Sequence, residues 1–179
     1  PDIQLAFLPS IVDDHTRKTH LGHGYTLHTT LMRPKSRGSV TLQSADPHQP
    51  PAIDPGFYTH PDDMAVAIKG ARMGFEILEA KAMAAYRGKR LHAVDVNDDK
   101  AMEAFLRATC DTEYHPVGTC KMGPDSDPMA VVDAQLRVKG VLGLRVVDAS
   151  IMPTLTSGNT NAPSMVIGEK AADLIRSGV

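Results

Sequence analysis

The sequence lacks a Gly-x-Gly-x-x-Gly turn, the glycine pattern that usually follows a strand and cradles the pyrophosphate of a dinucleotide. Gly70 and Gly74 do not supply this turn, because they lie within a helical pattern of apolar residues. A Gly-x-Ser-x-Gly nucleophile elbow is also missing. The chain therefore contains neither a complete dinucleotide-binding loop nor the serine turn of an α/β-hydrolase.

Other absences narrow the class of protein. No apolar run approaches the length of a membrane span, and no cleavable signal pattern is present. The net charge of −2 argues against nucleic acid or an anionic membrane surface as a partner. Cys110 and Cys120 do not make a disulfide framework, and each is expected to be a small buried residue. These features favour a location of the protein in a reducing cytoplasm, with peripheral membrane association as the alternative.

The composition is that of a soluble globular protein, with 42% hydrophobic and 22% charged residues in a chain long enough to bury a core. Short β-branched runs predict strands at 3–8, 25–32 and 39–43, the last two joined as a hairpin through a turn at 34–38. Capping residues and apolar spacing predict helices that begin at Pro61 and at Asp98 or Asp99. In these helices we expect an inward-facing apolar set, which includes Met64, Ile68, Ala71, Met73, Phe75, Leu78, Met102, Phe105 and Leu106.

One connection is rich in histidine, and imidazole is a common metal ligand. The spacing of these histidines fits no metal motif, and glycines between them indicate a flexible loop. We therefore predict no metal site and interpret them as solvent-facing or pocket-lining residues; they are His15, His20, His23 and His28.

His115 is the first candidate for chemistry. Pro116 disfavours the helical conformation for the residue before it, so the imidazole should be presented from an extended or turning segment. Histidine ionises closest to physiological pH and can serve as a proton acceptor. A His-Pro pair is also common at loop corners, and the pair alone does not decide between the two.

A strand predicted at 144–147 ends at Asp148. Ligands of open α/β sheets bind beyond the carboxyl ends of strands, which makes this carboxylate a candidate site residue. An aspartate after a strand is equally common as a helix cap or a loop anchor.

The last helix is predicted to start at Asn161 as its N-cap, with Pro163 in the first turn, where a missing N–H costs little. The free N–H groups at such a start suit an electron-rich ligand atom, although capping explains Asn161 equally well. The apolar face of this helix is predicted to consist of Val166, Ile167, Leu174 and Ile175.

Three motifs in this order, His115-Pro-Val-Gly-Thr-Cys-Lys-Met-Gly123, Asp148-Ala-Ser150 and Gly158-Asn-Thr-Asn-Ala-Pro163, resemble the C-terminal part of a GMC oxidoreductase. This glucose–methanol–choline family comprises FAD-dependent alcohol oxidases and dehydrogenases. The likeness covers nearly the whole chain and points to the choline dehydrogenase-like branch.

The resemblance implies an α+β fold in which an antiparallel-sheet substrate domain is covered by helices. Residues 1–112 would belong to that domain, and residues 113–179 would complete an α/β FAD-binding domain. The phosphate-binding glycines of the family lie in an N-terminal half. Since the chain also starts at Pro1 without an initiator methionine, we expect a fragment, either a cloned domain or a product of proteolysis.

The resemblance also assigns roles. His115 would accept the alcohol proton while hydride passes from the substrate carbon to flavin N5, and Asn161 would hydrogen-bond the substrate oxygen. Contacts to FAD are implied for Pro116, Asp148, Ala149, Ala162 and Pro163. The implied partners are a small alcohol, the missing N-terminal FAD-binding half, and oxygen or a quinone as electron acceptor. Without that half, the chain alone is expected to hold little or no FAD and to be inactive.

Two other functions compete with this one. The first is a non-enzymatic α+β binding module without a cofactor. The second, weaker one is a hydrolase that uses His115 with Ser150 and Asp148, for which no nucleophile elbow exists.

Overall fold

The computed structural model describes residues 1–178 and divides the chain into two compact units. The first unit contains Pro1–Gly38 and Pro55–Glu113, and the second contains Ser39–Asp54 and Tyr114–Val179. The described residues form short antiparallel sheets and three α-helices, so the expected combination of antiparallel strands with helices is confirmed.

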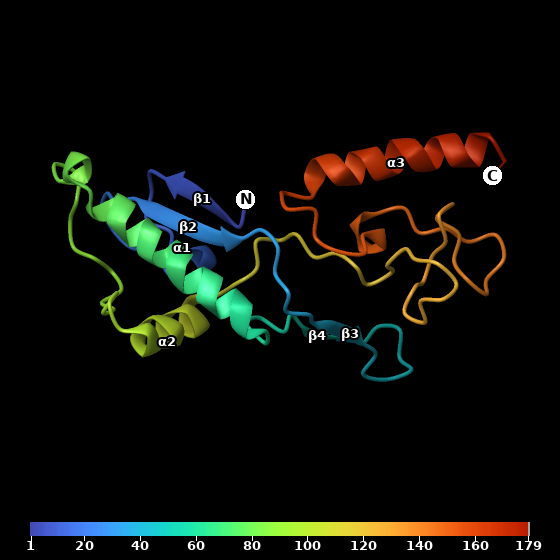
Figure 1. The fold of residues 1–179 in the computed structure, drawn as a ribbon, viewed down its shortest axis with the longest axis horizontal. Coiled ribbons are helices and arrows are strands. Elements are labelled where there is room, and N and C mark those ends of the chain that lie inside the picture. The colour runs from blue at the N-terminus through green and yellow to red at the C-terminus, as the bar shows by residue number, and fades with distance from the viewer. Residues whose placement is uncertain (179) are drawn as a thin grey trace. The chain divides into compact units, whose positions relative to one another are not determined.

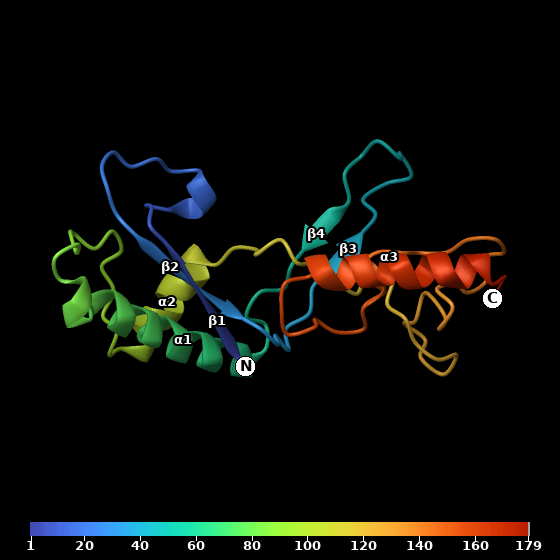
Figure 2. The ribbon, with the colours of Figure 1, turned by 90° about the horizontal axis from the view of Figure 1, so that it is seen from above.

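The sheet of the first unit has two strands. β1 (Ile3–Leu8) pairs antiparallel with β2 (Thr26–Leu31), in a register that opposes Ile3 to Leu31 and Leu8 to Thr26. α1 (Pro61–Glu79) lies along this sheet (Figures 1 and 2). Gly70 and Gly74 allow this approach, because a Cβ atom on Gly70 would lie 2.9 Å from the Ile3 side chain. The predicted strands and the helical placement of both glycines are confirmed.

The core of the first unit forms between α1 and α2 (Asp99–Thr109), whose N-cap Asp98 accepts a hydrogen bond from the Lys100 N–H. Met102 is fully buried there. Two single turns of 3₁₀ helix, η1 (Asp14–Thr16) and η2 (Lys81–Met83), lie in the connections. The other buried apolar residues of this core are Met64, Ala67, Ala71 and Leu106.

The predicted hairpin between 25–32 and 39–43 is wrong. β2 pairs with β1, whereas β3 (Ser39–Thr41) pairs antiparallel with β4 (Ala52–Asp54). The intervening turn is held by α1 instead, since the N–H groups of Lys35 and Ser36 donate to the Asp63 carboxylate. These bonds tie the turn to the first turn of α1.

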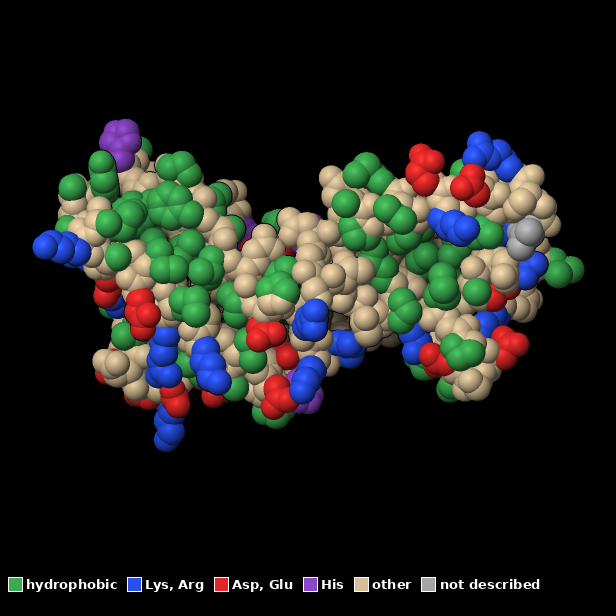
Figure 3. All heavy atoms as spheres, turned by 45° about the horizontal axis from the view of Figure 1, so that its top comes forward, with side chains coloured by type: hydrophobic (Ala, Val, Ile, Leu, Met, Phe, Trp, Pro, Cys, Tyr) green, Lys and Arg blue, Asp and Glu red, His purple; other side chains and the backbone are tan. Residues whose placement is uncertain are grey.

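In the second unit, η3 (Ala149–Ile151) and α3 (Asn161–Arg176) surround a small core. Ile167 and Leu174 of α3 pack against this core, as predicted. Val166 and Ile175 do not, since they are 67% and 57% exposed. Figure 3 shows hydrophobic side chains over α3 on the surface. The buried members of the core are Val132, Leu136, Ile151 and Ala171.

The predicted strand at 144–147 is also wrong. Arg145 makes one isolated antiparallel bridge with Arg137, and the main-chain bonds on either side join Val138 to Leu144 and Val146 to Leu136. Leu136 adopts a left-handed conformation with φ of 65°, which interrupts a regular ladder. Residues 131–133 and 136–138 also form only isolated bridges.

None of the helices in residues 1–178 has the length and apolar character required to cross a lipid bilayer.

Candidate active site

His115 lies in an irregular segment that opens the second unit. The preceding residue, Tyr114, has a left-handed backbone with φ of 60°, and Pro116 follows. The imidazole is half-buried. Its presentation from a non-helical segment is therefore confirmed, and a strained neighbour is a feature often found at functional sites.

The imidazole of His115 contacts the start of α3. Its Nδ1 lies 2.9 Å from Oγ1 of Thr160, a residue 45 positions further along the chain. Thr160 is the N-cap of α3 and is only 8% exposed. Two of the three sequence motifs are thus brought together by a hydrogen bond between side chains.

The remaining motif, Asp148–Ser150, is joined to the segment after His115 by main-chain hydrogen bonds. The N–H of Cys120 donates to the carbonyl of Ser150 at 3.0 Å, and the N–H of Met122 donates to that of Ile151 at 2.7 Å. Gly118 has φ of 91°, and a Cβ atom there would lie 3.3 Å from the Met152 carbonyl oxygen. The segment after His115 therefore runs against η3, which in turn contacts α3.

Asp148 caps a short helix, which is the local role that the sequence offered as an alternative to ligand binding. It is the N-cap of η3, and its Oδ1 accepts a hydrogen bond from the Ser150 N–H at 2.7 Å. Asp148 is exposed and Ala149 is half-buried. The carboxylate thus orders the turn that carries Ala149.

The predicted N-cap of the last helix is displaced by one residue. Thr160 is the N-cap, and Asn161 is the first helical residue, with an exposed side chain. Ala162 is exposed as well, and Pro163 falls in the first turn as predicted.

The start of α3 suits an electron-rich group. The first N–H groups of any α-helix have no partner within the helix, and the helix dipole places partial positive charge there. No side chain caps α3. The N–H groups of Asn161 and Ala162, close in sequence to the His115 contact, are of the type that binds a carbonyl oxygen of a flavin ring. The residues present therefore fit such a cofactor.

The contacts of His115 do not build a hydrolase triad. Its imidazole bonds to Thr160, and the Asp148 carboxylate accepts from the main chain of Ser150. A relay from serine through histidine to aspartate would need His115 bonded to Asp148. The hydrolase interpretation has no support in these contacts.

Three of the four histidines in the histidine-rich connection each pair with a different acid. His15 Nε2 lies 3.8 Å from Asp111, and His28 Nδ1 lies 3.6 Å from Glu113. His20 Nε2 lies 2.7 Å from Asp13. A hydrogen bond from His20 lowers the pKa of the Asp13 carboxyl below its ordinary value. Across residues 1–178, no group of three or more such side chains is arranged to hold a metal ion.

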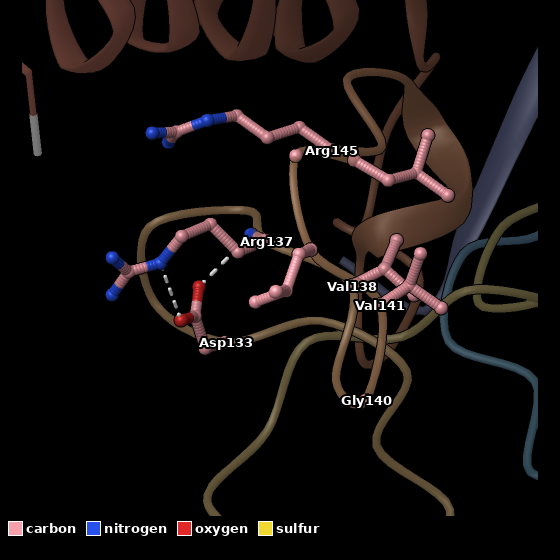
Figure 4. A pocket seen from close by; sticks show the side chains of 9 residues that line it. Asp133, Arg137, Val138, Gly140, Val141 and Arg145 are labelled. Carbon is pink, nitrogen blue, oxygen red and sulfur yellow. Dashed lines mark hydrogen bonds and ion pairs between the residues drawn. The ribbon is translucent and has the colours of Figure 1, made fainter.

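A surface hollow lies in the second unit around the turn at 139–143 (Figure 4). Its lining includes Asp133 and Arg137, which form an ion pair at 2.9 Å. None of the predicted site residues lines this hollow. It is separate from the contact between His115 and Thr160.

Thr160 is the one residue at this contact that the sequence analysis overlooked. A threonine directly before a predicted helix signals a cap, and that local role hides its contact with a distant histidine. The resemblance implied that His115 and Asn161 act on the same substrate, but it gave no role to the threonine between these segments.

Comparison with known families gives a match between residues 34–168 and the C-terminal model of the GMC oxidoreductase family. The chain is 46% identical to "Alcohol dehydrogenase [acceptor]" of Pseudomonas putida over 176 residues, 98% of this chain and 32% of that protein. It is 49% identical to mitochondrial choline dehydrogenase of Mus musculus over 177 residues, 98% of this chain and 30% of that protein. The chain thus spans about a third of the length of these relatives.

Solved structures resemble the chain over nearly its full length. A formate oxidase variant of Aspergillus oryzae RIB40, solved for the effect of a mutation on FAD modification, aligns with a TM-score of 0.88 and 29% identity. That alignment covers 99% of this chain and 32% of the oxidase. Pyridoxine 4-oxidase from Mesorbium loti aligns with a TM-score of 0.86 and 33% identity, over 97% of this chain and 34% of that one.

Proposed function

This chain belongs to the GMC oxidoreductase family, and we propose that it forms the C-terminal portion of an FAD-dependent dehydrogenase or oxidase that acts on the CH–OH group of a small alcohol. The relatives named as alcohol and choline dehydrogenases support the reaction class. Oxygen or a quinone is the electron acceptor in this proposal.

The observation that carries the proposal is the contact between His115 and the residue at the start of α3. It places an imidazole close to a helix N-terminus, with Asn161 as the next residue. A proton acceptor, an amide donor and main-chain N–H groups then belong to one small region of the second unit. In alcohol oxidation such groups can accept the hydroxyl proton and stabilise the developing negative charge.

His115 is the base in this mechanism. The O–H bond of the alcohol breaks, the proton moves to the imidazole, and the electron pair remains on the substrate oxygen. The Asn161 amide donates a hydrogen bond to that oxygen and stabilises its developing negative charge. Asparagine does not become a cation, so the proton goes to His115.

FAD, when bound, would supply the oxidant by taking up hydride from the substrate carbon at N5. In this proposal Ala162, Pro163 and Pro116 would hold the ring system, and Asp148 and Ala149 would hold the pyrophosphate or ribityl chain. The N–H groups at the start of α3 favour negative charge on that ring.

The two parts of the chain have different tasks in this proposal. Residues 1–112 form part of the substrate domain, and residues 113–179 complete the FAD-binding domain. An N-terminal half supplies the glycine-rich phosphate loop, which this chain does not contain. We therefore expect the chain alone to retain little or no FAD.

The test uses the full-length enzyme and a panel of alcohols with dye acceptors. His115→Ala should lower turnover by about 10²–10⁴-fold while the flavin absorbance stays, because only the proton transfer is lost. Asn161→Ala should lower it by about 10²–10³-fold through loss of an oxygen-stabilising donor. His48→Ala, in an exposed connection between β3 and β4, is the matched control. Wild-type turnover in His115→Ala would refute the proposed base.

A further inference from the structure

Thr160 occupies a helix N-cap without acting as one. Threonine at this position usually accepts a hydrogen bond from the N–H groups of the first turn. The Thr160 side chain makes no such bond to α3. Its hydroxyl instead lies 2.9 Å from Nδ1 of His115. The stabilisation that a cap normally gives is therefore forgone in favour of a contact with the histidine.

The main chain of Thr160 is held in place. Thr160 is 8% exposed, and its carbonyl accepts hydrogen bonds from both the N–H and the hydroxyl of Ser164, at 3.0 and 2.7 Å. The N–H of Thr160 also points at His115 Nδ1 as a donor, which by itself favours an Nδ1 without a proton, but its distance of 3.5 Å is at the outer limit of a hydrogen bond. The hydroxyl, at 2.9 Å, can accept from Nδ1 and makes the dominant contact. A buried, doubly anchored residue of this kind can orient a neighbouring ring.

We propose that Thr160 is a positioning residue for His115: its hydroxyl oxygen accepts the Nδ1–H and thereby keeps the lone pair of Nε2 directed to the substrate. This inference rests on the proposed role of His115 as base. A neutral imidazole carries one proton, and only the ring nitrogen without it can accept another. If Nδ1 carries the proton, Nε2 is the basic atom.

The hydroxyl is suited to both states of the ring. When Nε2 takes the alcohol proton, His115 becomes a cation in which both nitrogens are donors. The Thr160 oxygen then continues to accept from Nδ1, and this bond strengthens because the donor is charged. A group that could only donate to Nδ1 would oppose the transfer. Threonine therefore favours the product of the proton-transfer step.

The experiment compares Thr160→Val with Thr160→Ser in the full-length holoenzyme. Valine keeps the shape and removes the acceptor, whereas serine keeps the hydroxyl. We expect Thr160→Val to lower kcat by about 10–100-fold with little change in KM, which is the loss expected for a hydrogen bond to a charged group. Thr160→Ser should restore kcat to within a few-fold. Thr109→Val, at an exposed threonine in α2, should leave both constants unchanged.

Nitrogen-15 NMR of the histidine-labelled holoenzyme reports the tautomer directly, with the His115 signals identified by their loss in His115→Ala. We expect neutral His115 to carry its proton on Nδ1 in the wild type and in Thr160→Ser, and a mixture in Thr160→Val. If Thr160→Val loses FAD, the wild-type and serine spectra still decide the tautomer. A proton on Nε2 in the wild type, or kcat unchanged in Thr160→Val, would overturn the inference.

The two proposals fail in different ways. If His115→Ala keeps full turnover, the proposed function fails, whatever Thr160 does. If His115→Ala abolishes turnover while Thr160→Val matches the wild type in kcat and tautomer, only the positioning role of Thr160 is refuted.

Discussion

The N–H of Ser36 donates a hydrogen bond to Oδ2 of Asp63 at 2.7 Å, and the Ser36 hydroxyl donates to the same oxygen. The other oxygen of Asp63 accepts from the N–H of Lys35 at 2.9 Å. Asp63 is 4% exposed and lies in the first turn of α1. One buried carboxylate thus fixes the turn that follows β2 to the start of the helix that covers the sheet.

Replacement of Asp63 by asparagine should destabilise the first unit. The amide offers one acceptor oxygen instead of two, so at least one main-chain N–H of the turn loses its partner. A buried donor without a partner costs about 1–3 kcal/mol. The free energy of unfolding, measured by urea denaturation, should fall by that amount. Asp62→Asn is the control, because Asp62 is exposed and its ion pair with Lys35 should contribute little. Equal losses in both variants would contradict this role of Asp63.

The same carboxylate makes stability depend on acid. Burial by itself raises the pKa of Asp63, but the hydrogen bonds from Lys35 and Ser36 outweigh burial and leave the pKa below its ordinary value. A carboxyl whose pKa is lowered by folding stabilises the protein above its unfolded pKa, which is about 3.9. This stability is lost as the pH falls from there toward the folded pKa.

The measurement is the urea midpoint of the wild type and of Asp63→Asn between about pH 6 and pH 2.5, a window that spans the ordinary aspartate pKa. The difference between the two proteins should shrink as the pH falls below about 4, because the protonated wild type then resembles the amide variant. A difference that stays constant over this window would refute the assignment.

Gly56 is a position where the backbone leaves no room for a side chain. It has φ of 61°, and a Cβ atom there would overlap the carbonyl oxygen of Arg37. Gly140 also has a positive φ, of 79°, but open space around it. Gly140→Ala should cost about 1–2 kcal/mol, the penalty for a left-handed residue with a side chain. Gly56→Ala should cost a further ~1–3 kcal/mol from the steric overlap. Equal unfolding midpoints for the two variants would show that the overlap relaxes freely.

Local elements of this fold could be predicted from the sequence because their signals are local. The helix at 61–79 is predicted by Pro61, by acidic residues in its first turn and by regular apolar spacing. The pairing of strands could not be predicted in the same way. Ser39–Thr41 pairs with Ala52–Asp54, and the turn before it is held by Asp63, which lies 27 residues from Ser36. The left-handed Leu136, which interrupts the strand predicted at 144–147, has no sequence signal, since leucine rarely adopts that conformation.

In the candidate site, too, local motifs could be predicted from the sequence, whereas a long-range side-chain contact was missed. Each of the three motifs was visible in the sequence, and the hydrogen bonds of His115, Cys120 and Met122 bring them together. Their chemical roles remain predictions. Thr160 was missed because its neighbours indicate only a helix cap, whereas its partner lies 45 residues away. The apolar periodicity also gave a wrong buried face for part of α3, because Val166 and Ile175 fit the pattern but are exposed.

Two methionines of α1 provide a test of how far helical spacing predicts a core. Both Met64 and Met73 were expected inside, yet Met64 is 7% exposed and Met73 is 51% exposed. Met64 packs in the core with Met102 and Leu106 of α2. Met64→Ala should lower the free energy of unfolding by about 2–5 kcal/mol, through lost apolar contact and the cavity that remains. Met73→Ala should change it by less than about 0.5 kcal/mol, because its side chain already contacts water. Urea denaturation of the two variants side by side measures the contrast, and a loss at Met73 as large as that at Met64 would mean that another surface covers this face of α1.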